Sequence, residues 1–176
     1  MKVYILGIDH EIQVADGRRT QAEKGQFAKL LTEIFAQHRI EFIGEETFSE
    51  KASIARTFGG IAAIRWEPIE MSVDARKELG IADEQIYSRH EPQWEDNLIV
   101  ASSGPKRVPS DYIREEYMVW RTLTKAEGAA SILILCGFMH AESLGKLFQR
   151  EGHEVTVDTL CKREWYSHPE CEEVPS

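Results

Sequence analysis

The chain has 176 residues, and its 30 Asp and Glu residues outnumber its 21 Lys and Arg residues, which gives a formal net charge of −9. At about 150 residues per domain this length predicts a single domain, and a content of 42% hydrophobic and 29% charged residues excludes fibrous and disordered classes. An acidic surface repels phosphates and anionic lipids, so we expect neither nucleic acid nor a membrane as a partner.

The hydrophobic runs and the cysteines predict the location of the protein. The apolar run at the amino terminus is too short for a signal peptide, and the longest later run, residues 132–139, is far below the ~18 residues of a membrane span. The 3 cysteines lack the dense spacing of a disulfide scaffold. We therefore expect a cytoplasmic protein with reduced thiols.

The first third of the chain predicts strands alternating with helices. An apolar run predicts a strand over residues 2–8. Thr20 and Glu23 have the spacing of a capping box, and the periodic apolar residues after them predict a helix that ends near His38. A short apolar segment predicts a second strand over residues 41–44.

A second helix and a third strand are expected next. Thr47 and Glu50 repeat the capping-box spacing and predict a helix that reaches about Thr57. Gly59-Gly60 is expected to end this helix, and residues 61–66 then form the third strand.

Residues 67–108 are acidic and irregular, and a connection of this length is typical of a lid, a binding loop or an inserted helix. Four further elements are predicted after it: a helix over 111–127 with Ser110 as its N-cap, a buried strand over 131–137, a helix over 141–151 and a strand over 154–157.

This order predicts an α/β fold, with a mainly parallel sheet of about five strands and helices on both faces. We expect one domain over residues 1–160, with an insertion at about 67–108 and a C-terminal tail over 161–176. The first strand is expected beside the strand over 131–137, with the second and third strands on one side of this pair and the last strand on the other. Ligands bind such sheets at the carboxyl ends of the strands, beside the point where the strand order reverses.

Two Gly-x-x-His motifs, Gly7 to His10 and Gly137 to His140, close the first and fourth of these strands. Because neighbouring strands lie ~4.8 Å apart, we expect both imidazoles over one crevice. His140 begins the helix that follows, where the helix dipole favours a neutral ring. The alternative is that the two histidines serve only their turns.

Carboxylates are expected on the same rim. Glu45 and Glu46 follow the second strand directly, and Asp9 and Glu11 flank His10. Two imidazoles with one or two carboxylates suit a divalent metal such as Mn, Zn or Co, whose bound water attacks an amide or ester carbonyl. The candidate metal ligands are His10, His140 and Glu46. The alternative for the two glutamates is a solvated loop that compensates helix charge.

Arg114 lies on the helix predicted after Ser110. We expect it to bind a substrate carboxylate or to stabilise an oxyanion. The alternative is an exposed cation paired with Glu115 or Glu116.

These motifs resemble the TraB/Tiki group and its erythromycin-esterase and ChaN-like relatives. The resemblance rests on the paired Gly-x-x-His motifs, the Glu after the second strand, Arg114-Glu115-x-x-Met118 and the run 133–144 followed by Gly152. It implies catalytic roles for His10, His140, Glu45 or Glu46, and Arg114. Tiki-like members are regarded as metal-dependent proteases and erythromycin-esterase members as hydrolases, whereas ChaN-like members bind haem.

The resemblance and the motif pair together predict a hydrolase that acts on an amide or ester bond of a small-molecule or peptide substrate. Two alternatives remain: a binding protein that holds haem or another small ligand between the same histidines, and an interaction protein that recruits a partner through its acidic surface.

Overall fold

The computed structural model describes residues 1–47, 53–81, 109–168 and 171. Five parallel strands form one sheet in the order β3-β2-β4-β1-β5. The strands are β1 (Lys2–Ile8), β2 (Phe42–Glu45), β3 (Arg65–Pro68), β4 (Ser131–Gly137) and β5 (Glu154–Thr159). The predicted fold class and strand order are confirmed.

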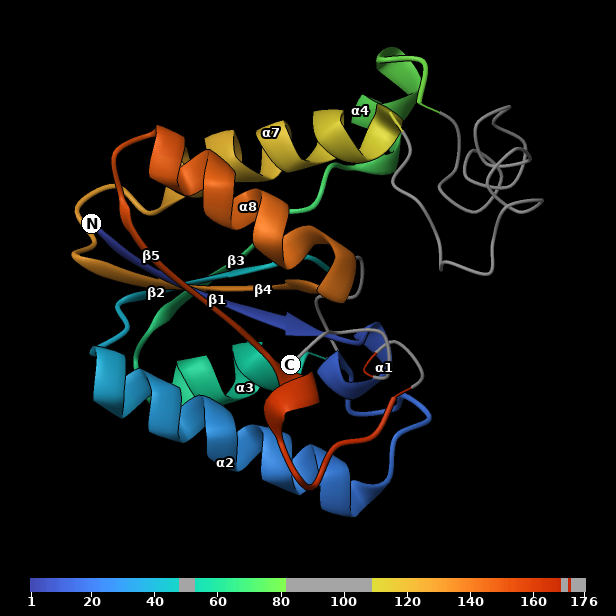
Figure 1. The fold of residues 1–176 in the computed structure, drawn as a ribbon, viewed down its shortest axis with the longest axis vertical. Coiled ribbons are helices and arrows are strands. Elements are labelled where there is room, and N and C mark those ends of the chain that lie inside the picture. The colour runs from blue at the N-terminus through green and yellow to red at the C-terminus, as the bar shows by residue number, and fades with distance from the viewer. Residues whose placement is uncertain (48–52, 82–108, 169–170, 172–176) are drawn as a thin grey trace.

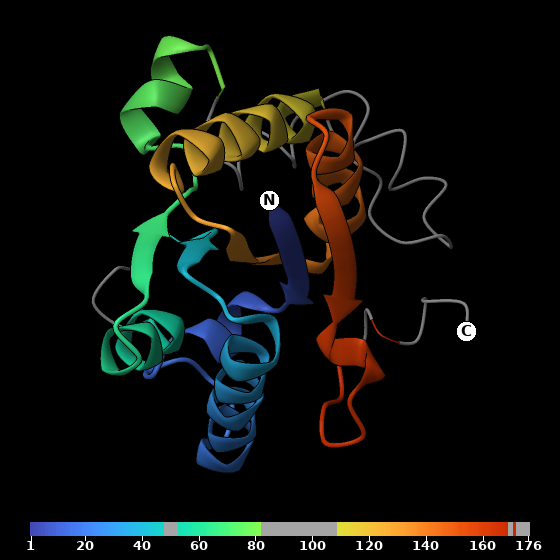
Figure 2. The ribbon, with the colours of Figure 1, turned by 90° about the vertical axis from the view of Figure 1, so that its left-hand side faces the viewer.

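Helices cover both faces of the sheet (Figure 1). In the views of Figures 1 and 2, α2 and α3 lie on one face, and α7 and α8 lie on the other. The described helices are α1 (His10–Gln13), α2 (Gln21–His38), α3 (Ile54–Ile61), α4 (Val73–Glu78), α7 (Pro109–Lys125), α8 (Phe138–Arg150) and the short 3-10 helix η2 (Leu160–Lys162). None of them is long and apolar enough to cross a bilayer.

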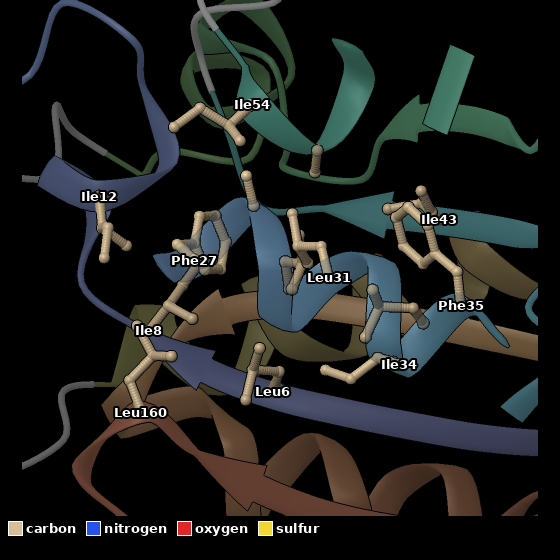
Figure 3. Packing of buried hydrophobic residues seen from close by; sticks show 14 of the residues in the cluster. Leu6, Ile8, Ile12, Phe27, Leu31, Ile34, Phe35, Ile43, Ile54 and Leu160 are labelled. Atoms are coloured by element: carbon tan, nitrogen blue, oxygen red, sulfur yellow. The ribbon is translucent and has the colours of Figure 1, made fainter. Parts of the chain in front are cut away.

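Each face of the sheet has its own hydrophobic cluster. Figure 3 shows Phe27, Leu31 and Ile34 of α2 above Leu6 and Ile8 of β1. The central position of β4 explains its unbroken apolar sequence, because a parallel strand with helices on both sides buries every side chain. The predicted capping box of Thr20 and Glu23 is present at the start of α2.

The boundaries of α3 and β3 differ from the prediction. Ser53, rather than Thr47, is the N-cap of α3, and the helix continues through Gly59-Gly60 to Ile61, so β3 starts only at Arg65. The two glycines lie within the helix, and Gly59 has a packing role there: a Cβ at this position would lie 2.8 Å from Cδ1 of Ile43 in β2. Glu50, the other half of the expected capping box, lies outside the described residues.

The starts of α7 and α8 and the structure of the predicted insertion also differ from the sequence prediction. α7 begins at Pro109, so Ser110 lies within the helix and is not its N-cap; proline suits a first helical position because the N–H it lacks would have no helical partner there. α8 begins at Phe138, which places His140 in its first turn. The predicted irregular stretch is partly regular, since it contains α4; its residues 82–108 lie outside the described part of the chain.

The expectation of reduced thiols is wrong for two of the three cysteines. Cys161 and Cys171 form a disulfide, and Cys136 is free and buried in β4. The two half-cystines are 10 residues apart in the sequence. They are brought together by a reversal of the chain after β5 that spacing alone does not reveal.

Candidate functional site

The two Gly-x-x-His turns meet at the carboxyl ends of β1 and β4. The strands are in register, with Ile8 paired to Gly137. His10 Nε2 and His140 Nε2 both face Oε1 of Glu46, at 4.0 and 3.5 Å. Gly137 lies between the rings, since a Cβ there would be 3.2 Å from His10 Nε2 and 3.7 Å from His140 Cδ2. The structure therefore brings together the two histidines that the motifs single out.

His140 is buried between two carboxylates. Its Nδ1 lies 2.7 Å from Oε1 of Glu115, and the hydroxyl of Ser143 donates to the other oxygen of Glu115 at 2.6 Å. Burial lowers the pKa of His140, but the charges of Glu46 and Glu115 outweigh it, so that the pKa is raised above its ordinary value. The prediction that the helix dipole keeps this ring neutral has the wrong direction, because two adjacent carboxylates favour the imidazolium more strongly.

His10 has different surroundings and is the accessible member of the pair. Its side chain is 56% exposed, which leaves the ring open to water and substrate. Nδ1 lies 2.6 Å from Oε1 of the buried Gln13, whose Nε2 donates to the backbone carbonyl of Glu46 at 3.0 Å. Because the amide oxygen of Gln13 can only accept, Nδ1 of His10 donates to it, which leaves Nε2 as the ring nitrogen that can accept a proton.

Glu46 is the carboxylate that both histidines share. The backbone N–H of Gly137 donates to its Oε2 at 2.8 Å, and Nη2 of Arg114 lies 2.9 Å from its Oε1. Arg114 is only 2% exposed, and its guanidinium also contacts Glu70 at 2.6 Å and Asp111 at 3.4 Å. The alternative of an exposed Arg114 is therefore wrong, and this geometry makes Arg114 a group that holds Glu46 in place.

Glu45 contacts a different set of residues from Glu46. Successive residues of a strand point to opposite faces, and the Glu45 carboxylate accepts from Ser53 Oγ at 2.5 Å and from Trp66 Nε1 at 2.6 Å. Its other oxygen, Oε1, is buried without a hydrogen-bond partner. Burial raises the pKa of Glu45 to about 7, although these two donors and the charge of nearby His10 lower it. Of the two predicted glutamates, Glu46 and not Glu45 contacts the histidines.

The other expected carboxylate, Asp9, supports the local fold. As the N-cap of α1, it accepts from the backbone N–H groups of Glu11 and Ile12 at 2.6 and 3.0 Å. Burial raises the pKa of Asp9. The hydrogen bonds from Tyr166 and Arg19 and the charge of Arg19 lower this pKa by more, so it lies below its ordinary value.

Sequence reasoning missed three residues that hold the site: Glu115, Ser143 and Gln13. In the sequence Glu115 stands out only as a partner of its neighbour Arg114 and as part of the Arg114-Glu115-x-x-Met118 motif. Ser143 follows His140 by three residues on one helix, a spacing that places both on one face. Gln13 has the same spacing from His10, but the four-residue α1 was not anticipated.

The predicted metal site of His10, His140 and Glu46 stays a prediction. Within the parts of the chain that the structure describes, no three His, Cys, Asp or Glu residues are grouped so as to hold a metal. Both oxygens of Glu46 already receive N–H donors, and a cation at Oε1 would lie beside the Arg114 guanidinium. Two imidazoles around a fixed carboxylate also suit proton transfer.

Comparison with known proteins adds no assignment. No family model, no curated protein and no solved structure matches the chain. The resemblance to the TraB/Tiki group therefore depends on the motif residues alone and stays a prediction.

Proposed function

We propose that this protein is a hydrolase of ester or amide bonds, in which His10 is the general base and His140 the general acid. The observation that carries the proposal is the convergence of both imidazoles on Glu46 from two different strand ends. The two rings have opposite surroundings, since one is exposed and the other is enclosed by carboxylates. Two titratable groups with environments this different are suited to the separate roles of base and acid.

His10 is the group that activates water. Its exposed ring can contact a water molecule, and the Gln13 contact leaves Nε2 free to accept the proton. The resulting hydroxide attacks the carbonyl carbon of the substrate, and a C–O bond forms while the carbonyl oxygen becomes an oxyanion.

His140 is the group that completes the reaction. With Glu115 at Nδ1 and Glu46 facing Nε2, both ring nitrogens lie beside a carboxylate and the imidazolium is favoured. Its Nε2 proton passes to the departing alkoxide or amine as the bond to the carbonyl carbon breaks. The proton on His10 then returns to solvent and His140 is reprotonated, so that the net reaction consumes one water.

The substrate class and the location stay predictions. The net charge of −9 favours a small molecule or a peptide over nucleic acid. The expected cytoplasmic location conflicts with the Cys161–Cys171 disulfide, because cytosolic reductants keep most thiols reduced.

A panel of p-nitrophenyl esters and peptide p-nitroanilides tests the proposal. His10→Ala and His140→Ala should each lower kcat/KM by roughly 10²- to 10⁴-fold, the range of general acid–base catalysis. Glu115→Gln should lower the rate and Glu116→Gln should not, because the neighbouring Glu116 pairs with Arg150 on the surface. Rates in both histidine variants equal to that of the wild type would refute the proposal.

The same variants test the two remaining expectations. Metal analysis and chelator treatment check the predicted Mn, Zn or Co, which His10, His140 and Glu46 would bind. Addition of haem checks the ChaN-like alternative, since a Soret band that disappears in His140→Ala, in a protein without hydrolase activity, would favour ligand binding.

A further inference from the structure

The segment after η2 returns to the first histidine turn. Tyr166 in this segment is buried, and its hydroxyl donates to Oδ2 of Asp9. Asp9 is the N-cap of α1, so its side chain fixes the turn whose first helical residue is His10. A residue near the C-terminus thus holds the cap that sets the position of one proposed catalytic group.

Arg19 joins the same contact from the other side. Its Nε donates to Asp9 Oδ2 at 2.9 Å, its Nη2 to the Tyr166 hydroxyl at 3.2 Å and its Nη1 to the Ser167 carbonyl at 3.0 Å. The guanidinium also lies over the Tyr166 ring, 4.9 Å from its centre. The C-terminal segment is therefore bound to the Asp9 turn through its backbone, a hydroxyl and an aromatic face.

The second histidine turn contacts this segment as well. The ring of Phe138, two residues before His140, lies 6.0 Å from the Tyr166 ring and 5.7 Å from the His168 ring. Tyr166 and His168 in turn stack on each other at 6.3 Å. One short segment therefore contacts both Gly-x-x-His turns, and Figure 1 shows it in red, passing below α1 after η2.

A disulfide closes this segment. Cys161 in η2 is bonded to Cys171, and Tyr166 lies between them in the sequence. Both half-cystines are only half-buried, so a reductant can reach them.

We propose that this C-terminal strap (Cys161–His168 with Cys171) is a redox-sensitive positioning device for the catalytic histidines. The strap acts on His10 through Tyr166 and Asp9, and the disulfide keeps it in place. The inference rests on the proposed hydrolase function.

The redox step needs a dithiol reductant. One thiolate of the dithiol attacks a sulfur of the Cys161–Cys171 bond and forms a mixed disulfide, and its second thiol then displaces the remaining cysteine. Two electrons and two protons pass to the protein, giving two cysteine thiols and the disulfide of the reductant. A disulfide such as oxidised glutathione takes back the two electrons and two protons by the reverse exchange, which re-forms the Cys161–Cys171 bond and restores activity.

Tyr166→Phe tests the positioning role, because it removes one hydroxyl and keeps the ring. We expect kcat to fall by roughly 10- to 100-fold, the cost of a small misplacement of a catalytic group, with KM little changed. The NMR signals of the His10 ring, assigned with His10→Ala, should move at the same time. Tyr117→Phe is the control for the loss of a tyrosine hydroxyl, since Tyr117 lies in α7 and its ring packs on Trp120.

Two experiments test the redox role: dithiothreitol reduces the disulfide of the wild type, and Cys171→Ser removes the disulfide by substitution. Each should lower kcat and move the His10 signals, and dithiothreitol should have no further effect on the variant. A reduced wild type that keeps its full rate and unchanged His10 signals would overturn the redox part, and an unaltered Tyr166→Phe would overturn the positioning part. If no substrate is hydrolysed, the proposed function fails, whereas movement of the His10 signals on reduction still supports the strap.

Discussion

The buried carboxyl of Glu45 should make the free energy of unfolding depend on pH. Its carboxyl is fully buried, one of its oxygens has no hydrogen-bond partner, and its pKa is raised from 4.5 to about 7. In the unfolded chain the group ionises from about pH 4.5 upwards, whereas in the folded protein it keeps its proton to about pH 7. The unfolded state thus binds fewer protons over this interval, and the free energy of unfolding falls as the pH rises.

The size of this effect follows from the two pKa values. Each pH unit between them corresponds to about 1.4 kcal/mol, so the folded state loses about 3 kcal/mol between pH 4.5 and 7. Glu45→Gln removes the titration and keeps the shape and the acceptor for Ser53 and Trp66. The pKa of His140 is also raised, so loss of its proton likewise lowers the free energy of unfolding as the pH rises. The contribution of Glu45 is therefore the difference in this free energy between the wild type and Glu45→Gln.

Urea unfolding at a series of pH values measures this difference. The free energy of unfolding of the wild type, minus that of Glu45→Gln, should fall by about 3 kcal/mol from about pH 4.5 to pH 8 and then level off. Glu116→Gln, which removes an exposed carboxylate, controls for the change in net charge. A difference that is flat across this range would show that Glu45 is ionised in the folded protein and would refute the reasoning.

Three other predictions concern the site and the strap. Gly137→Ala should lower the rate of hydrolysis while the fold persists, because the new Cβ would lie 3.2 Å from His10 Nε2 and displace the ring; Gly60→Ala, whose Cβ would meet nothing within 4 Å, is the control, and circular dichroism checks the fold. Glu115→Gln should lower the pKa of His140 and move the alkaline limb of the pH–rate profile to lower pH, and an unmoved profile would contradict the assigned role. Cys171→Ser should lower the free energy of unfolding by about 3 kcal/mol in the absence of reductant, which denaturation with and without dithiothreitol measures.

The fold was largely predictable because its strongest features are local patterns. The apolar run in β4 and the periodic face of α2 each depend on a few adjacent residues, and right-handed crossovers leave few strand orders. The wrong predictions concern residues whose role depends on a contact with another part of the chain. Gly59 has the appearance of a helix end, but it is needed for the close approach of α3 to β2. The Cys161–Cys171 pair likewise depends on a turn after β5 that no sequence pattern marks.

The candidate site was predictable in part for a related reason. Parallel strands end at one edge of the sheet, so equal motifs after β1 and β4 must meet there, and Glu46 joins them from β2. The rotation of a helix about its axis decides which side chains complete the site, and spacing within α7 does not reveal it. Arg114 was therefore assigned to substrate, whereas the structure directs it to Glu46 and directs its neighbour Glu115 to His140.

The charges around Glu46 explain why the site favours a protonated His140. Among the residues that the structure describes, the buried guanidiniums of Arg114 and Arg76 pair with Glu46, Glu70 and Asp111, and Glu115 lies against His140. A proton on His140 gives Glu46 and Glu115 a positively charged neighbour, and buried charges are stable only when they are paired. A substrate oxyanion would bring further negative charge and strengthen the need for that proton. The same electrostatic balance that stabilises the end of the sheet thus prepares His140 to donate a proton.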